Sequence, residues 1–407
     1  MTNVDVMNNV IDCDIAIVGG GMAGSALACA LAGSAYRVVI IENAEPKPFV
    51  QDNFFDARVV ALSAASQKFF ERLGAWDFIR AQRLSPFERM QVWDAEGTAQ
   101  VCFDAADVQQ SALGHIVENS LVLSALQQRL QQAANVRWLC PDTVFGLYDD
   151  QKNQHCELEL RSGTTVICQL VIAADGAQSA LRKLSGIKTL EWDYGHSAVV
   201  ATVRTENTHE RTARQRFMAS GPLAFLPLRN NDGDEHWSSI VWSTAPEAAQ
   251  TLLDLSEAEF ASQLGKAFEH TLGDILEVRG RFSFPLRQRH AQMYHQRRVV
   301  LIGDAAHTIH PLAGQGVNLG FMDVKVLAEE LLDALKKKLP PAHPAVLKRY
   351  QRRRRGENLS MTATMELFQR LFARKELPLR WLRNTGMKGI DALPAVKRKI
   401  MRSAMGL

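Results

Sequence analysis

The chain has 407 residues, of which 46% are hydrophobic and 22% are charged, and its formal net charge at pH 7 is +3. This composition is typical of a folded globular protein, and the length predicts roughly two to three structural units. A charge so close to neutrality argues against nucleic acid as a partner. Six cysteines are scattered without a C-x-x-C pair, which favours reduced thiols in a cytoplasmic protein over a disulfide framework.

An uncharged stretch at residues 15–36 has the length of a membrane span or a signal peptide. Asp5, Asp12 and Asp14 precede it where a leader would have basic residues, and three consecutive glycines at residues 19–21 interrupt it. No other apolar run approaches the length of a span. We therefore expect neither a span nor a leader, and any membrane contact to be peripheral.

The same stretch predicts a dinucleotide site instead. A β-branched run at residues 14–18 is followed by G-x-G-x-x-G, then by a small-residue helix expected at residues 25–35 and a second strand at residues 37–42. Glu42 ends that strand, where an acid is needed to bind a ribose hydroxyl. The residues assigned to this site are Gly19, Gly21, Met22, Ala23, Gly24 and Glu42.

A second buried strand, at residues 170–174, also ends in an acid. Asp175 opens the pattern D-G-x-x-S-x-x-R, in which Ser179 is expected to cap a helix and Arg182 to turn back toward a phosphate or carboxylate. The alternative is a simple capping turn with a surface arginine.

From about residue 192 to 286 the pattern changes to alternating strands. We expect a largely antiparallel sheet inserted between two parts of an α/β domain, serving as a substrate layer. Its aromatic residues are individually more typical of sheet packing than of substrate contact; they are Phe217, Phe225, Trp237 and Trp242.

Residues 298–323 are the most informative stretch. A buried parallel strand at residues 299–302 breaks at Gly303 and Asp304, which delivers a carboxylate to a ligand at the strand end. A Gly-Gln-Gly turn at residues 314–316 then opens a helix whose amides suit an electron-rich ring or an anion. His307 and His310 superficially complete a metal triad with Asp304, but Pro311 interrupts helical geometry, so we predict no metal.

The C-terminal region is strongly basic. Residues 348–402 contain sixteen Lys and Arg against four Asp and Glu, mixed with large apolar side chains. Such amphipathic helices could lie on anionic lipid or bind a partner protein. The alternative is that they pack on the nucleotide-binding domain with their charges in solvent.

The ordered trio of G-x-G-x-x-G at Gly19, D-G-x-x-S-x-x-R at Asp175 and G-D-A-A-H at Gly303 resembles the FAD-dependent aromatic hydroxylases of the p-hydroxybenzoate hydroxylase type. Residues 310–323 fit the tighter pattern of their ubiquinone-biosynthesis branch. The resemblance implies a Rossmann-like α/β FAD-binding domain at residues 1–85, 105–185 and 295–345. It also implies an inserted antiparallel β-sheet substrate domain at residues 86–104 and 186–294, with basic C-terminal helices at residues 346–407.

The resemblance also assigns roles to the motif residues. Gly19, Gly21 and Gly24 would cradle the FAD pyrophosphate, and Glu42 would hold the adenosine ribose. Arg58, in the pattern D-x-R-x-x-A-L-S, would lie over the diphosphate and ribityl region. Asp175 and Arg182 belong to a motif linked to FAD and to the nicotinamide donor, and Gly303 and Asp304 to the ribityl or diphosphate end. The isoalloxazine site would contain Pro311 beside the reacting edge and Gly314, Gln315, Gly316, Val317 and Asn318 near the pyrimidine ring.

The implied activity is hydroxylation of a polyprenylated benzoquinol, most like a demethoxy-ubiquinol, with NADPH or NADH and O2 through a C4a-hydroperoxyflavin. Alternatives are another ring position in the same pathway, a small phenol, or a non-catalytic flavin-binding component of a quinone-biosynthesis complex. The implied location is cytoplasmic or peripheral on the inner membrane. The C-terminal region could mediate membrane or complex contacts, and a homo-oligomer is compatible with the family.

Overall fold

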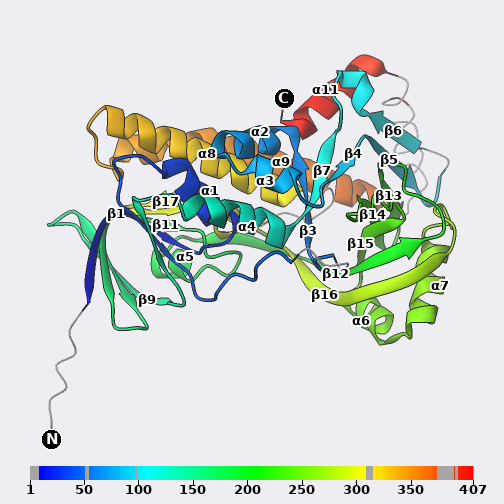
Figure 1. Cartoon of the computed structure of the whole chain (residues 1–407), viewed down its shortest axis with the longest axis horizontal. Coiled ribbons are helices and arrows are strands. Elements are labelled where there is room, and N and C mark those ends of the chain that lie inside the picture. The colour runs from blue at the N-terminus through cyan, green and yellow to red at the C-terminus, as the bar shows by residue number, and fades with distance from the viewer. Residues whose placement is uncertain are drawn as a thin grey trace, which may run out of the picture.

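The computed structural model describes residues 9–50, 55–97, 100–308, 315–373, 389 and 393–406. They form two large sheets, one small sheet and a set of helices (Figure 1). The expected α/β architecture with an antiparallel sheet late in the chain is confirmed.

The first large sheet has the order β17-β18-β11-β1-β2-β8. Five of its strands run parallel: β1 (Val10–Val18), β2 (Val38–Ile41), β8 (Val136–Leu139), β11 (Thr165–Ala173) and β18 (Val299–Leu301). Three further strands pair antiparallel at its margins: β9 (Val144–Asp150), β10 (His155–Leu160) and β17 (His295–Gln296). The fully buried parts of the parallel strands, at residues 15–18, 38–41, 170–173 and 299–301, are apolar runs because helices cover the sheet.

The helix α1 (Met22–Leu31) follows β1 and packs against α4 (Asn119–Leu130) and α8 (Gln315–Lys336). It begins earlier and ends earlier than the helix expected at residues 25–35. The early start follows from Gly21, whose extended backbone forms the N-cap, and the early end from Ala32, whose ψ of 138° leaves the helical region. Gly33, with φ of +72°, then completes the reversal.

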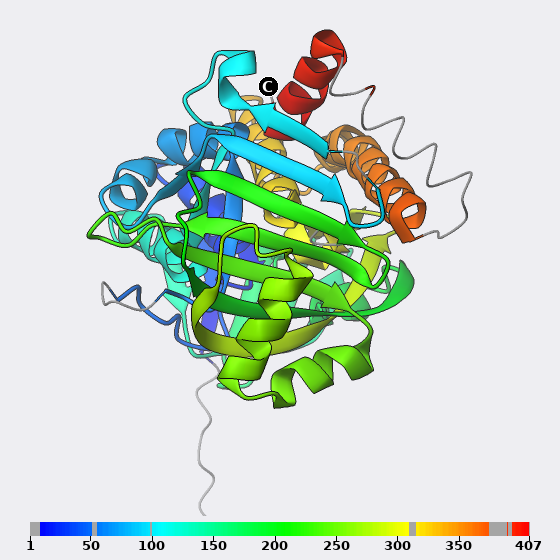
Figure 2. The same ribbon diagram turned by 90° about the vertical axis from the view of Figure 1, so that its right-hand side faces the viewer.

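The second large sheet has the order β19-β16-β12-β15-β14-β13-β5-β6. Its strands are β5 (Arg89–Asp94), β6 (Gln100–Asp104), β12 (Thr189–Thr205), β13 (Thr212–Met218), β14 (Gly221–Leu228), β15 (Trp237–Thr244), β16 (Ile275–Ala291) and β19 (His307–Thr308). Helices α6 (Pro246–Asp254) and α7 (Glu257–Ala267) cover its outer face (Figure 2). Phe225, Trp242 and Phe260 pack in the core between these layers, as expected for the two sheet aromatics.

A small sheet, in the order β3-β7-β4, lies between the two large sheets (Figure 1). It consists of β3 (Val59–Ser63), β4 (Ser85–Phe87) and β7 (Gly114–Glu118). The nearby helices are α2 (Ala64–Leu73), α3 (Trp76–Arg80) and the 3-10 helix η1 (Ala105–Val108). Short helical segments α5 (Ala180–Leu184) and η2 (Gly303–Ala305) follow the strands β11 and β18.

The C-terminal helices are α9 (Pro344–Ala373) and α11 (Pro394–Met405). α9 packs on α8, while α11 lies beside η1 at the end of β6 (Figure 2). Met401 and Met405 of α11 are buried against Val108 and Leu113. The two helices therefore attach to different parts of the fold.

Candidate active site

Strand register brings the three sequence motifs to one edge of the parallel sheet. Val18 of β1 is aligned with Ala173 of β11, and Ala173 with Leu301 of β18. The residues that follow these strand ends include Gly19, Asp175 and Gly303. Because ligands of parallel α/β sheets bind at the carboxyl ends of the strands, the motifs converge on one candidate site.

The glycine turn combines tight packing with one open position. Gly19 has φ of +105°, and a Cβ there would collide with the carbonyl of Ala174. A Cβ on Gly24 would collide with the carbonyl of Gly19. A Cβ on Gly21 would meet nothing within 4 Å, and no side chain of the described chain caps the start of α1. The open position and the first amides of α1 therefore leave room for a phosphate group.

Glu42 is fixed at the neighbouring strand end. Its Oε2 accepts a hydrogen bond from the Gly20 amide over 2.5 Å, and its Oε1 accepts one from the Ala44 amide over 3.2 Å. Each carboxylate oxygen keeps acceptor capacity for a ligand hydroxyl. The side chain is only partly buried, so such a hydroxyl can reach it.

Asp304 and Asp175 have the surroundings expected of groups that face a ligand. The Asp304 residue is exposed to solvent, yet desolvation raises the pKa of its carboxyl group. His307 opposes this rise in pKa, and Asp323 adds to it. Accessibility together with desolvation indicates a carboxylate in a recess. Asp175 Oδ2 accepts from the Leu181 amide over 3.2 Å, whereas its Oδ1 is buried with no partner in the described chain.

The capping role expected for Ser179 is confirmed, and Arg182 is buried, unlike the surface arginine of the alternative. Ser179 Oγ accepts from the Arg182 amide over 2.9 Å. The Arg182 guanidinium is buried and donates to the carbonyls of Ala305 and Ala177 over 2.7 and 2.8 Å. Arg182 therefore joins the turn after β11 to η2 and is not a surface arginine, and its predicted contact with a phosphate or carboxylate stays a prediction.

Arg58 is exposed, and a buried ion pair that sequence reasoning missed holds its loop. Glu118 and Arg83 are joined by two hydrogen bonds of 3.0 Å each, and Glu118 also accepts from the Asp56 amide over 2.6 Å. Asp56 in turn accepts from the Ser120 amide over 3.1 Å. The loop backbone is thus fixed while the Arg58 side chain extends outward.

Asn318 connects α8 to the segment that follows Arg58. Its Oδ1 accepts from the Ser63 amide over 3.0 Å and from Ser66 Oγ over 2.7 Å, and its Nδ2 donates to the Ala61 carbonyl over 2.8 Å. The buried side chain therefore positions the start of α8 against β3 and α2. Its predicted proximity to the flavin stays a prediction.

A second network missed from sequence lies beneath η2. Asp323 is completely buried and accepts from the Gly303 amide over 3.1 Å, from His307 Nε2 over 2.5 Å and from Arg354 Nε over 2.8 Å. Asn358 Nδ2 adds a fourth hydrogen bond of 3.0 Å. Burial alone would raise the pKa of Asp323, but His307 and Arg354 outweigh it and hold the pKa below its usual value.

The described residues contain no cluster of His, Cys, Asp or Glu able to hold a metal ion. His307 uses Nε2 to bind Asp323. His310, Pro311 and Gly314 lie outside the described residues, so their predicted roles stay predictions. Gln315, Gly316 and Val317 stand in the first described turn of α8.

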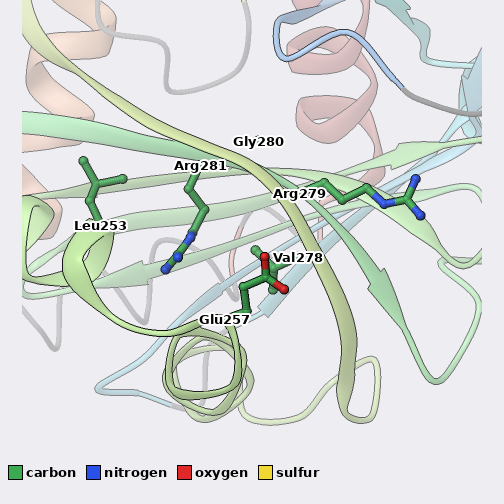
Figure 3. A pocket seen from close by; sticks show the side chains of 6 residues that line it. All are labelled: Leu253, Glu257, Val278, Arg279, Gly280 and Arg281. Atoms are coloured by element: carbon green, nitrogen blue, oxygen red, sulfur yellow. The ribbon is translucent and has the colours of Figure 1, made fainter.

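A pocket of 610 Å³ lies elsewhere, on the outer side of the antiparallel sheet (Figure 3). It is lined by β16 and by residues of α6 and α7, among them Leu253, Glu257 and Arg281. The Arg281 guanidinium is held by the Leu255 carbonyl over 2.8 Å. This pocket is separate from the strand ends that carry the three motifs.

Known proteins resemble this chain over nearly its whole length. Residues 12–363 match the family described as an FAD binding domain. The chain is 41% identical to the 3-demethoxyubiquinol 3-hydroxylase of Escherichia coli, over 97% of this chain and 98% of that protein. It is 34% identical to the human mitochondrial ubiquinone biosynthesis monooxygenase COQ6, over 96% and 92%.

The chain belongs to the ubiquinone-biosynthesis family of FAD-dependent hydroxylases. Its fold resembles the p-nitrophenol 4-monooxygenase PnpA of Pseudomonas putida, with a TM-score of 0.79, 22% identity and 98% coverage of both chains. PqsL of Pseudomonas aeruginosa is similar at a TM-score of 0.77 and 20% identity, with 93% of this chain and all of that chain covered. As a member of this family the chain is an FAD-dependent monooxygenase.

The residues at the strand ends fit FAD. The open face of Gly21 and the uncapped start of α1 suit a pyrophosphate, while Glu42 suits a ribose. The unpartnered Asp175 Oδ1 and the recessed Asp304 are acceptors for further hydroxyl or amide groups. Within the described residues, no helix is both long enough and apolar enough to span a bilayer.

Proposed function

We propose that this hydroxylase acts on the ring of a polyprenylated benzoquinol of the demethoxy-ubiquinol type, with NADPH or NADH and O2 as co-substrates. The observation that carries the proposal is the 41% identity to the 3-demethoxyubiquinol 3-hydroxylase of Escherichia coli over nearly the whole of both chains. A substituted quinol is electron-rich, so the chemistry needs no dedicated protein base on the ring.

An apolar row on the antiparallel sheet supports a hydrophobic substrate. Val241 is paired with Ala224 on one side and with Val200 on the other, and Val200 with Phe282. Directly paired residues share one face of a sheet. The opposite face carries Trp242 and the core under α6 and α7. Ala224, Val241 and Phe282 are only partly buried, so an apolar surface is available on the face turned away from these helices.

The proposed holding residues follow from the site geometry. The amides around Gly21 would bind the FAD pyrophosphate, Glu42 the adenosine ribose, and Asp304 the ribityl or diphosphate end, with Arg58 reaching over them. Bound FAD would accept a hydride from the nicotinamide and activate O2. The chain's own task is to orient the ring beside the flavin and to exclude bulk water.

Mass spectrometry of the quinone pool in a strain lacking this gene tests the substrate. A demethoxylated intermediate should accumulate, and the intact gene should remove it. Accumulation of another intermediate would assign a different ring position, and an unchanged pool would favour a small phenol. Purified yellow protein that never oxidises NADPH faster with the quinol would favour a non-catalytic flavin-binding component.

We also propose that α11 contacts the surface of an anionic bilayer, which would suit a substrate with a long apolar tail. Leu393, Val396 and Ile400 are exposed large hydrophobic residues at helical spacing beside the buried face of α11. The helix carries four Lys and Arg residues and no acid. Apolar side chains flanked by cations are the pattern of an interfacial helix.

Sedimentation with phosphatidylglycerol vesicles, compared with phosphatidylcholine vesicles, tests this contact. The double variant Val396→Ser with Ile400→Ser should bind the anionic vesicles more weakly than the natural protein. A control that removes two exposed charges elsewhere, Lys152→Gln with Arg161→Gln, should bind as well as the natural protein. Equal binding by all three proteins would refute the contact without affecting the proposed substrate.

A further inference from the structure

Strands β16 and β19 carry buried polar side chains with nitrogen atoms that lack hydrogen-bond partners in the described chain. Gln288, His290 and His307 are 2%, 2% and 1% exposed. Gln288 Nε2, both ring nitrogens of His290 and His307 Nδ1 have no hydrogen-bond partner in the described chain. Leaving such groups unsatisfied is unfavourable, and native proteins satisfy buried polar groups with protein or ordered water. Four together indicate a hydrated site.

These side chains lie on the same face of the sheet. Gln288 and His290 are two residues apart on β16, and the side-chain period of a strand is two. His290 is paired directly with His307 on β19. Such cross-strand pairs place their Cβ atoms about 5 Å apart. The gaps between the three polar ends are therefore short enough for bridging water molecules.

The row connects two different environments. At one end Gln288 Oε1 accepts a hydrogen bond from the hydroxyl of Tyr194, a residue that is only partly buried. At the other end His307 Nε2 is bound to Asp323, which also holds the Gly303 amide. Gly303 and Asp304, which are assigned to the FAD site, stand in η2, just before β19. The row thus extends from the partly buried Tyr194 to the Asp323 carboxylate that holds the Gly303 amide.

The monooxygenase reaction requires a proton at such a place. A ring C–H, O2, NAD(P)H and one proton yield a ring C–OH, NAD(P)+ and water. Each turnover therefore takes one proton from solvent into a site that must exclude bulk water. A chain of fixed polar groups and trapped water satisfies both demands.

We propose that Gln288, His290 and His307 enclose a chamber of ordered water that conducts protons between Tyr194 and η2, which carries Asp304 of the predicted FAD site. The proposal rests on the monooxygenase activity but not on the identity of the quinol. A proton enters one nitrogen of His290 from water as another leaves from its second nitrogen, so the imidazole ends each transfer neutral.

The surroundings of His290 keep its ring neutral between transfers. Burial first of all, and then the nearby His307 and Arg355, lower the pKa of His290 to about 4, although Asp323 opposes them. Tyr294 contributes an aromatic ring whose centroid is 5.6 Å from that of His290. A neutral imidazole keeps one donor and one acceptor, which is the state needed to relay a proton.

Steady-state turnover of the FAD-loaded protein with a short-tailed demethoxy-ubiquinol tests the relay. His290→Leu should lower kcat at neutral pH by roughly tenfold or more, as for loss of acid–base assistance, with unchanged FAD affinity. His290→Gln keeps a donor and an acceptor, but its amide cannot pass a proton from one end to the other, so it should retain FAD and ordered water yet lose rate as His290→Leu does. His155→Gln, on β10 in the other sheet, is the control and should behave as the natural protein.

The relay would be overturned if His290→Leu had the same kcat and pH profile as the natural protein. Loss of FAD from that variant would also overturn it, because it would show that the role of His290 is structural. A high-resolution structure of the natural FAD-loaded protein provides a test that needs neither a variant nor a substrate. It should show ordered water within hydrogen-bond distance of His290, and a dry chamber would overturn the proposal. Failure of the natural protein to hydroxylate the quinol would instead count against the proposed substrate.

Discussion

Arg354 Nε lies 2.8 Å from Asp323 Oδ1, and the two side chains are 2% and 0% exposed. Arg354 belongs to the most basic stretch of the chain, yet it points into the protein and joins α9 to α8. The same Asp323 carboxylate holds the Gly303 amide and His307. A charge expected to face lipid, a partner or solvent therefore supports the backbone that carries Asp304.

Replacing Arg354 should destabilise the fold and loosen FAD. The variant Arg354→Met leaves the buried Asp323 carboxylate without its compensating cation, and breaking such a pair costs roughly 3–5 kcal/mol. The midpoint of chemical unfolding and the release of flavin fluorescence measure both effects. Arg352→Met, at an exposed position of the same helix turn, should change the free energy of unfolding by less than about 0.5 kcal/mol. Indistinguishable variants would mean that the pair is dispensable.

The glycine turn makes a separate prediction about the cofactor. Gly21→Ala adds a methyl group that meets no protein atom within 4 Å but enters the space assigned to the pyrophosphate. We expect a folded protein whose FAD affinity falls by roughly tenfold or more, which corresponds to about 1.4 kcal/mol. Fluorescence titration of the apoprotein measures it. Gly356→Ala, also open but on α9, is the matched control, and equal affinity of the two variants would place the pyrophosphate elsewhere.

The motif residues could be predicted from sequence because each motif is local. A buried strand, a turn and a helix start stand within a few residues of one another at Gly19, Asp175 and Gly303. Parallel strands end at the same sheet edge, so recognising the strands was enough to bring these motifs together. The antiparallel sheet was predictable for the same reason, since its alternation of residues is visible strand by strand.

The contacts of Arg182 and Asp323 that support η2 were not predictable in this way, because the residues that make them are far apart in the sequence. Arg182 reaches the Ala305 carbonyl, and nothing in the D-G-x-x-S-x-x-R pattern indicates that partner. The basic stretch did contain one usable signal. Tyr350, Arg354 and Asn358 recur every four residues and form one buried face of α9, which net charge alone conceals.

Stability should fall on mild acidification because of His115. Burial lowers the pKa of this histidine from 6.5 to about 4, with Glu71 partly opposing the shift. Between these pH values His115 binds a proton in the unfolded chain but stays neutral in the folded chain, so the free energy of unfolding decreases as the pH drops. The contribution is complete above pH 6.5, amounts to up to about 3 kcal/mol, and is lost on approaching pH 4.

Urea unfolding of the natural protein and of His115→Gln at several pH values between 6.5 and 4 isolates this contribution. The variant should show a shallower pH dependence, whereas His155→Gln should keep the natural one. Other buried histidines contribute to both proteins, so the difference between the two curves is the informative quantity. Parallel curves would show that His115 does not titrate on unfolding.

The apolar row on the antiparallel sheet predicts a difference between two adjacent residues of β16. Phe282 belongs to the row through its pair with Val200, whereas Ser283 is exposed and pairs with Val199 on the opposite face. Phe282→Gln places an amide against the proposed quinol, and loss of one buried aromatic contact is worth about 1.5–3 kcal/mol. Quinol-stimulated NAD(P)H oxidation should show KM raised at least about tenfold with FAD retained. Ser283→Gln should leave KM and FAD content unchanged, and the same KM in both variants would remove this face of the sheet from substrate binding.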